Sequence, residues 1–290
     1  MTSPKYFAPK SIKEAISLLS EFGQKAKVIS GGTDLLMQMK QKELLPDYLI
    51  SLGDIPDLDY IKYDEIRGLK IGALTNVVNI ANSPLIRSKF SILAQAASLL
   101  GTPAIRNQAT IGGNLCNAAP SADTAPPLLV LGAMAKIEGA AGEKIVPFEN
   151  FFTGPGQTIL GNNHLLTEIQ IPHLLPHSGG VYLKQTRSQG ADLALVGVAA
   201  LVVMEGKILR DVKIALGAVA PTPIRAKRAE EILKGNKLDN QLLEASGQVA
   251  SSEAKPIDDV RSSADYRRKL VAVLTKRAVT QAVQQAQLEV

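Results

Sequence analysis

The chain is poor in residues that carry out chemistry on their own. It has one cysteine, three histidines and no tryptophan among its 290 residues. The single cysteine, Cys116, excludes an internal disulfide, a cysteine-ligated iron–sulfur cluster and a four-cysteine zinc site within this chain. This cysteine usage predicts a reducing, cytoplasmic setting.

Long hydrophobic segments are also missing. The longest apolar run, residues 194–204, is shorter than the ~18–20 residues that span a bilayer, and Gly197 interrupts it. The first five residues lack the apolar core of a secretion signal. We therefore expect neither a membrane span nor a secretion signal. The length is sufficient for two or three globular domains.

The charge distribution gives no sign of a nucleic-acid partner. Basic residues number 32 and acidic residues 27, for a net charge of +5, but the basic residues are dispersed. The few aromatic side chains do not alternate with them as a base-stacking surface requires. The modest positive charge better suits an anionic cofactor or an acidic partner surface.

We find no catalytic or metal motif made of side chains. His173 and His177 are four residues apart, but Pro176 intervenes and no carboxylate is close, so we interpret them as solvent-facing loop residues. Neither a Ser–His–Asp arrangement nor a general acid–base pair of carboxylates is visible. Cys116 has no second cysteine to resolve it, so we interpret it as a small packed residue. A bound cofactor is therefore expected to carry the chemistry.

Two glycine pairs are the main positive signal. Gly31-Gly32 follows a short apolar run, and Gly112-Gly113 lies in a second loop rich in small polar residues. Glycine lets backbone N–H groups approach an anion closely and adopts positive φ without steric cost. Either pair alone is compatible with a simple turn, and neither has Rossmann or Walker A spacing. Together they suit a dinucleotide diphosphate.

The hydrophobic periodicity divides the chain into three parts. Residues 1–56 are predicted to form a small α/β lobe, and residues 57–176 a second lobe. Within the second lobe, residues 105–117 show no periodicity and are predicted to form a long functional loop. Residues 177–290 contain three strands followed by helices, which predicts a separate α+β domain.

Four separated segments carry a family resemblance. They are residues 28–35 (VISGGTDL), 105–114 (IRNQATIGGN), 182–187 (YLKQTR) and 217–225 (GAVAPTPIR). In this order and spacing the chain resembles the flavin-binding subunit of the molybdenum hydroxylases, the group that includes xanthine dehydrogenase and carbon monoxide dehydrogenase. The resemblance covers essentially the whole chain, and residues 110–123 and 220–225 look most like bacterial purine (xanthine-type) dehydrogenase subunits.

The resemblance implies an α+β structure with the FAD-binding fold of vanillyl-alcohol oxidase (PCMH type). Two α/β lobes would hold FAD between them, and a C-terminal α+β domain with a three-stranded sheet and helices would follow. By motif match, the cofactor-binding residues would be Val28, Ile29, Ser30, Gly31, Gly32, Thr33, Asp34, Leu35, Leu100, Thr110, Ile111, Gly112, Gly113, Asn114, Asp123, Leu166 and Lys184.

Individual roles also follow from the resemblance. Residues 28–35 would wrap the diphosphate, and residues 110–114 would meet it and the ribityl chain from the opposite side. Asp123 would bind the ribityl or adenosine end, and Lys184 would stabilise negative charge on the reduced ring. Leu193 occupies a position where the carbon monoxide branch commonly has an aromatic residue over the ring, which favours the purine-type branch.

The implied function is that of an FAD-carrying electron-transfer subunit. Substrate would be oxidised at a molybdopterin centre in a large subunit, and electrons would pass through 2Fe–2S clusters of a small subunit to this FAD. The FAD would then reduce NAD⁺ or another acceptor, and we expect a dimer of heterotrimers. The alternatives are a self-sufficient flavin reductase or oxidase of the same superfamily, and a non-catalytic nucleotide-binding regulator.

Overall fold

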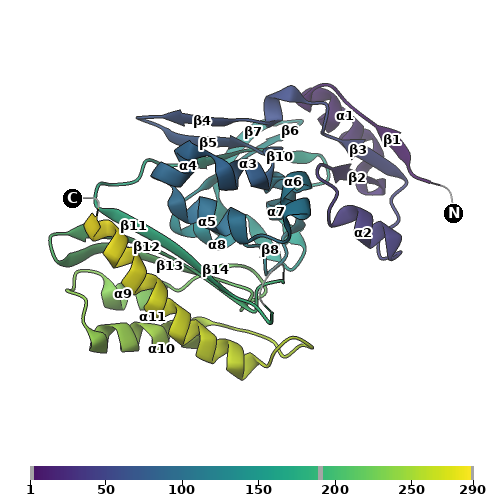
Figure 1. Ribbon diagram of the computed structural model, residues 1–290. Helices are drawn as coiled ribbons and strands as arrows, with labels where there is room; N and C mark the ends of the chain where they lie inside the picture. Colours follow the sequence, from purple (N-terminus) through teal and green to yellow (C-terminus); the bar gives the residue numbers. More distant parts are fainter. Residues whose placement is uncertain (1–2, 189–191, 289–290) are drawn as a thin grey trace.

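The computed structural model describes residues 3–188 and 192–288 as an α+β protein with three main β-sheets (Figure 1). A small N-terminal sheet and a five-stranded central sheet lie toward one end, and a four-stranded C-terminal sheet lies toward the other. Helices α3 to α8 form a layer beside the central sheet. Within this layer, α5 and α8 also contact the C-terminal sheet.

The N-terminal sheet is parallel and carries the first glycine pair. Its strands, in sheet order, are β1 (Lys5–Phe7), β3 (Tyr48–Ser51) and β2 (Ala26–Ile29). Helix α1 (Ile12–Phe22) is capped by Ser11, whose hydroxyl accepts a hydrogen bond from the Glu14 backbone N–H at 3.2 Å. The 3₁₀ turn η1 (Gly23–Lys25) and helix α2 (Leu35–Lys40) flank β2.

The central sheet is antiparallel, and its middle strand is buried along most of its length. In sheet order the strands are β4 (Ile61–Asp64), β5 (Gly68–Gly72), β10 (His164–Ile171), β6 (Met134–Gly139) and β7 (Gly142–Pro147). Short elements flank them: η2 (Pro56–Leu58), η3 (Phe148–Asn150), β8 (Phe152–Gly154) and β9 (Gln157–Thr158).

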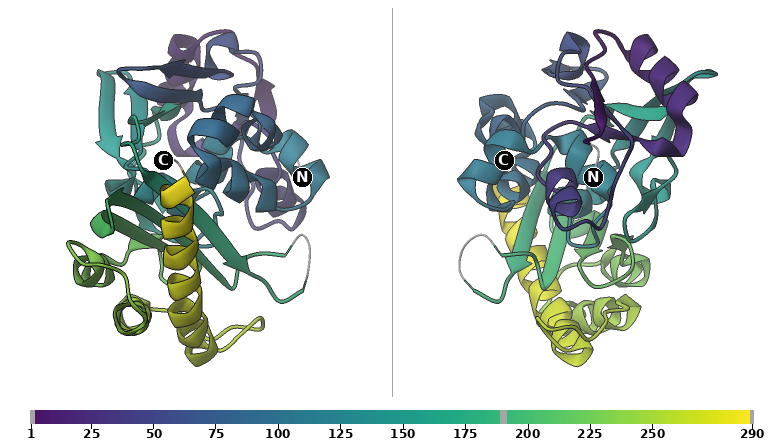
Figure 2. Two further views of the ribbon diagram at one scale, coloured as in Figure 1. Left: turned by 60° about the vertical axis from the view of Figure 1, so that its left-hand side comes forward. Right: turned by 90° about the vertical axis from the view of Figure 1, so that its right-hand side faces the viewer.

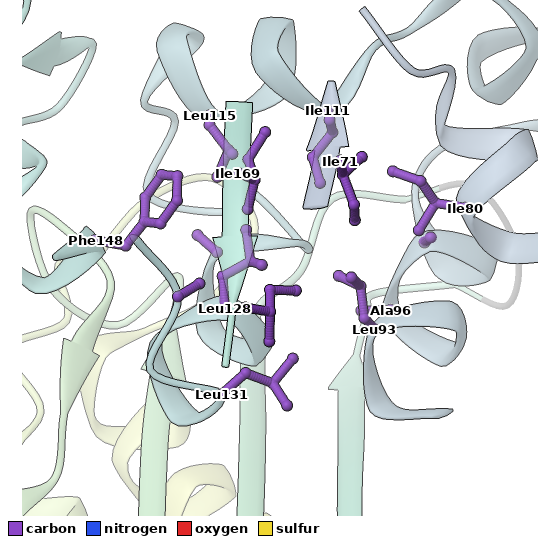
Figure 3. Close-up of a cluster of buried hydrophobic side chains, with 14 of the residues drawn as sticks. Ile71, Ile80, Leu93, Ala96, Ile111, Leu115, Leu128, Leu131, Phe148 and Ile169 are labelled. Atoms are coloured by element: carbon purple, nitrogen blue, oxygen red, sulfur yellow. The ribbon is translucent and has the colours of Figure 1, made fainter. Parts of the chain in front are cut away.

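Short helices supply the layer beside this sheet. They are α3 (Val77–Asn82), α4 (Pro84–Lys89), α5 (Ser91–Leu99), α6 (Pro103–Gln108), α7 (Ile111–Asn117) and α8 (Ala125–Val130). Figure 3 shows Ile71 and Ile169 of the sheet among Ile80, Leu93 and Ile111 of the helices. The same core cluster includes Tyr182, Ala199 and Ala215 of the C-terminal sheet. One continuous core therefore joins the two larger sheets through the helical layer.

The C-terminal sheet is antiparallel and is covered on its other face by helices. Its strands are β11 (Ser178–Gln185), β12 (Val196–Glu205), β13 (Ile208–Gly217) and β14 (Ile224–Arg225), in that order. The helices are α9 (Lys227–Leu233), α10 (Asn240–Glu253) and α11 (Ala264–Leu288). Figure 2 shows α11 lying across the strands, where its apolar residues form a second core with the sheet.

The α+β class is confirmed, with two local differences from prediction. The C-terminal sheet has a fourth, two-residue strand, β14, which was not expected. Residues 105–117, predicted as a loop, mostly belong to the helices α6 and α7. The domain boundaries after residues 56 and 176 stay predictions. Among the helices of the described residues, none is long and apolar enough to cross a membrane.

Candidate functional site

The first glycine loop presents a row of unused backbone donors. Residues 30–34 connect β2 to α2, and Gly32 has φ of +71°. Among the described residues, none accepts a hydrogen bond from the backbone N–H groups of residues 30–35, whereas the next N–H, of Leu36, donates to Gly32 O at 3.0 Å. Consecutive free N–H groups in a tight loop form a concave binding site for an anion.

The second glycine pair lies in the first turn of α7, and residues 108–114, the second loop, pack directly on the first loop. A Cβ atom at Gly31 would lie only 2.0 Å from the carbonyl oxygen of Gln108, so only glycine fits there. The Thr110 hydroxyl donates to Ser30 Oγ at 3.1 Å. The two loops, 80 residues apart in sequence, therefore meet as the glycine pairs predicted.

The backbone of the second loop is used differently. Thr110 caps helix α7, and its hydroxyl accepts from the Gly113 N–H at 3.0 Å. The neighbouring N–H groups also have acceptors within the protein: Ile111 donates to Thr75 O, Gly112 to Ala73 O and Asn114 to Thr110 O. The first loop therefore offers free N–H groups, while the second loop has its own N–H groups bonded within the protein and packs against the first.

A chain of polar contacts continues from the second loop to the C-terminal sheet. The Thr124 hydroxyl donates to Asn114 Oδ1 at 2.6 Å, and Asp123 is the preceding residue. Asp123 Oδ1 accepts from the Tyr182 hydroxyl at 2.8 Å, and Asp123 Oδ2 lies 2.8 Å from Lys184 Nζ. The first loop, α7 and β11 therefore belong to one polar assembly.

Burial controls the electrostatics of this assembly. The side chains of Asp123 and Lys184 are 6% and 4% exposed. Burial raises the pKa of the Asp123 carboxyl, and the Lys184 ammonium and Tyr182 hydroxyl oppose that rise. Burial and the nearby Asp123 raise the pKa of Tyr182 well above its usual value. Lys184 is therefore a paired cation, whose charge is compensated by the Asp123 carboxylate.

The predicted residues lie on several elements. Val28 and Ile29 end β2, Leu35 begins α2, Leu100 follows α5, Ile111 to Asn114 open α7, Leu166 lies in β10 and Lys184 in β11. Leu100 and Leu166 are buried, whereas Leu193 is 60% exposed between β11 and β12. The structure brings the two loops, Asp123 and Lys184 into one assembly. The contacts of each residue with a cofactor stay predictions.

Three contributors to the site were not anticipated: the Tyr182 hydroxyl, the Thr124 hydroxyl and the Leu99 carbonyl, which accepts from Lys184 at 3.0 Å. The position of Tyr182 had a sequence signal, because residues two apart on a strand face the same side and Lys184 was already a candidate. The Leu99 carbonyl had none, since it depends on tertiary packing.

Two family matches cover almost the whole chain. Residues 2–174 match the FAD binding domain in molybdopterin dehydrogenase, and residues 181–282 match the CO dehydrogenase flavoprotein C-terminal domain. The chain belongs to the FAD-binding subunits of the molybdenum hydroxylases. The resemblance inferred from the four segments is confirmed, and with it membership of an oxidoreductase family.

Individual relatives match over almost their full length. The chain is 34% identical to the carbon monoxide dehydrogenase medium chain of Hydrogenophaga pseudoflava, over 96% of each protein. It is 31% identical to the putative xanthine dehydrogenase FAD-binding subunit of Escherichia coli K12, over 96% of this chain and 95% of that one. Carbon monoxide dehydrogenase from Hydrogenophaga pseudoflava superimposes with a TM-score of 0.95, at 33% identity and over 98% of each chain. Quinoline 2-oxidoreductase from Pseudomonas putida 86 gives 0.92 at 29% identity, also over 98% of each chain.

Proposed function

We propose that this subunit carries one FAD and relays electrons through it within a heteromeric molybdenum hydroxylase. Electrons would arrive from 2Fe–2S clusters of a small subunit, after substrate oxidation at a molybdopterin centre in a large subunit. NAD⁺ or another acceptor would receive them. Bound FAD supplies the needed chemistry, because a flavin exchanges electrons singly or in pairs.

The free N–H groups of residues 30–35 are the observation that carries this proposal. A diphosphate brings two negative charges and several acceptor oxygens, which match consecutive N–H donors in a glycine loop. Gly31 packs against the Gln108 carbonyl, so a larger residue at this position would displace the loop. The residues present therefore fit the group that the family binds.

The remaining residues would act around this anchor. Thr110 and Asn114 would orient the cofactor from the second loop, largely through side chains, since the N–H groups there already have acceptors. Asp123 would bind a polar part of the cofactor, and Lys184 would lie near the ring and adjust its potential. Leu100 and Leu166 would line the site, and Leu193 would cover the ring.

The partners follow from what this chain lacks. With one cysteine it cannot itself ligate two 2Fe–2S clusters, so a small subunit would hold them. Relatives named for carbon monoxide, xanthine and glyceraldehyde dehydrogenases are 34%, 31% and 34% identical to this chain. Relatives named for different substrates are thus about equally similar to this chain, which supports a substrate site in the large subunit and not in this one. We propose a cytoplasmic dimer of heterotrimers.

The diphosphate site is tested with two variants of one residue. Thr33→Asp places a negative charge in the loop, and Thr33→Asn has nearly the same shape without the charge. We expect the Asp variant to bind FAD about 30-fold more weakly than the wild type, through repulsion of the diphosphate. The Asn variant should stay within about threefold. Equal losses in both variants, measured by flavin fluorescence titration, would contradict a diphosphate at this loop.

A ligand series checks the same point from the other side. FAD should bind more tightly than FMN, and FMN more tightly than riboflavin: the first step removes one phosphate together with adenosine, and the second removes the remaining phosphate. The purified chain should also show little NADH oxidation until the two partner subunits are added. Full turnover by the chain alone would instead favour a self-sufficient flavin reductase.

A further inference from the structure

Two glycines of the C-terminal sheet leave space beside Lys184. Gly197 on β12 lies directly opposite Lys184 on β11 and also opposite Gly217 on β13. Directly opposed residues of antiparallel strands face the same side of a sheet. One lysine and two glycines therefore form a row across three strands, and two of its positions have no side chain.

Other parts of the chain fill the space above the glycines. A Cβ atom at Gly197 would lie 2.6 Å from the Tyr182 hydroxyl oxygen, and one at Gly217 would lie 2.8 Å from Pro126 Cγ. The Ala218 N–H donates to Pro120 O at 2.7 Å. Neither glycine has positive φ, so their small size is what the structure uses. The segment from Pro120 to Pro126, which contains Asp123, therefore sits directly on the sheet.

Tyr182 and Lys184 approach Asp123 from the same strand face. The Tyr182 hydroxyl donates to Oδ1, and Lys184 Nζ meets Oδ2, each at 2.8 Å. Tyr182 is 1% exposed, so its hydroxyl is held by packing as well as by this bond. The bond to Oδ1 disfavours rotation of the carboxylate and so favours the orientation in which Oδ2 is directed at Lys184.

We propose that Tyr182 is a positioning residue of the FAD site, which acts through Asp123 to fix the Lys184 ammonium. Gly197 leaves the space through which the Tyr182 hydroxyl reaches Asp123. The inference rests on the proposed function in assigning Lys184 to the flavin. Its structural part, the restraint of Lys184, concerns this chain alone.

The central variant is Tyr182→Phe, and the chain offers a matched control. Tyr60 also donates to a carboxylate, Glu168, at 2.5 Å, and a lysine, Lys70, lies 3.8 Å from that carboxylate. Tyr60→Phe thus removes a hydroxyl from a second, more exposed Tyr–carboxylate–Lys group, separate from the Asp123–Lys184 pair. Gly197→Ala is a second test variant, because it keeps the Tyr182 hydroxyl and displaces it.

The first measurement needs no cofactor. Acetylation of Lys184 in the full FAD-free chain is followed by peptide mass spectrometry under native conditions. In Tyr182→Phe and in Gly197→Ala, Lys184 should be acetylated about fivefold faster than in the wild type, because the Asp123 carboxylate that holds the amine is less restrained. Tyr60→Phe should leave the rate unchanged. A Lys184 rate in Tyr182→Phe equal to that in Tyr60→Phe would overturn the positioning role.

The second measurement uses bound FAD. Tyr182→Phe should weaken FAD binding about tenfold and make the flavin midpoint potential more negative, while Tyr60→Phe changes neither. A wild-type chain that binds no FAD would refute the proposed function, and the acetylation result would still decide the role of Tyr182. FAD binding and potential identical in the two Phe variants would leave the proposed function standing and refute the link from Tyr182 to the flavin.

Discussion

Asp123 and Lys184 form a buried ion pair that joins the segment between α7 and α8 to strand β11, with 2.8 Å between Oδ2 and Nζ. Because both side chains are almost fully buried, each charge depends on the other for compensation. Any change at Lys184 therefore also changes the environment of Asp123. Lys184 cannot be treated as an independent positive charge.

Breaking this pair on one side should be costly. Lys184→Met leaves the Asp123 carboxylate buried without its cation, and we expect a loss of about 3 kcal/mol in the free energy of unfolding. The double variant Asp123→Asn/Lys184→Met removes both charges and should lose only about 1 kcal/mol. Urea unfolding of the FAD-free chain measures both. A double variant as unstable as the single one would show that the stranded carboxylate is not the cause.

The same two variants predict the behaviour of the bound flavin. In the proposed site, with Lys184 near the ring, Lys184→Met leaves a net negative charge that disfavours reduction, so the flavin midpoint potential should fall by roughly 30–60 mV. The double variant restores net neutrality and should return close to the wild-type value. Spectroelectrochemical titration at neutral pH checks this. An unchanged potential in Lys184→Met would remove Lys184 from the flavin environment.

The contact between the two loops gives a prediction about packing. Gly31→Ala puts a methyl group where the Gln108 carbonyl oxygen lies, so the loops must separate. We expect a loss of about 2–3 kcal/mol in stability, together with loss of tight FAD binding. Gly53→Ala is the control, because its Cβ would lie 3.5 Å from its nearest neighbour, an ordinary contact. Retention of FAD affinity in Gly31→Ala would show that the loops need not touch to bind it.

The sequence predicted much of the fold because its signals there were local. The short apolar run before Gly31-Gly32 and the three C-terminal strands followed by helices are local patterns, and β2, β11 to β13 and α9 to α11 are present there. Residues 105–117 were assigned wrongly as a loop, since their two helices are too short to establish an apolar period. Their caps were nevertheless readable: the hydroxyls of Thr102 and Thr110 each accept an N–H three residues later.

The candidate site was predictable only in part, for a physical reason. Glycine pairs indicate that another segment approaches the backbone closely, so a contact between the two loops could be expected. The hydrogen-bond partners could not be predicted. Nothing in the sequence indicates that the Gly112 N–H donates to Ala73 O while the N–H groups of residues 30–35 stay free. The strand β14 was missed because two residues carry no period.

Cys116 provides a test of interior packing near the second loop. The thiol is partly buried against the hydrophobic core, and this burial raises its pKa to about 12, so almost no thiolate is present at neutral pH. We expect the native chain to react with a disulfide reagent at least about 100-fold more slowly than the guanidinium-unfolded chain. Since the chain contains no other cysteine, the colour change reports this residue alone. Rapid labelling of the native protein would contradict the packed thiol and reopen a redox role.

Asp259 provides the pH prediction. Burial alone would raise the pKa of this carboxyl, but hydrogen bonds from Arg261 and Arg267 outweigh that effect and hold it well below the unfolded value of 3.8. A depressed folded-state pKa contributes stability above the unfolded pKa, and the contribution is lost as the pH falls through the folded-state value. Asp259→Asn should therefore be less stable than wild type at pH 7, and the gap should narrow below about pH 4. Asp211→Asn, which removes an exposed ion pair with Lys234, should change the urea midpoint little at any pH. A gap between wild type and Asp259→Asn that stays constant from neutral to acid pH would mean that the arginines do not stabilise the ionised carboxylate.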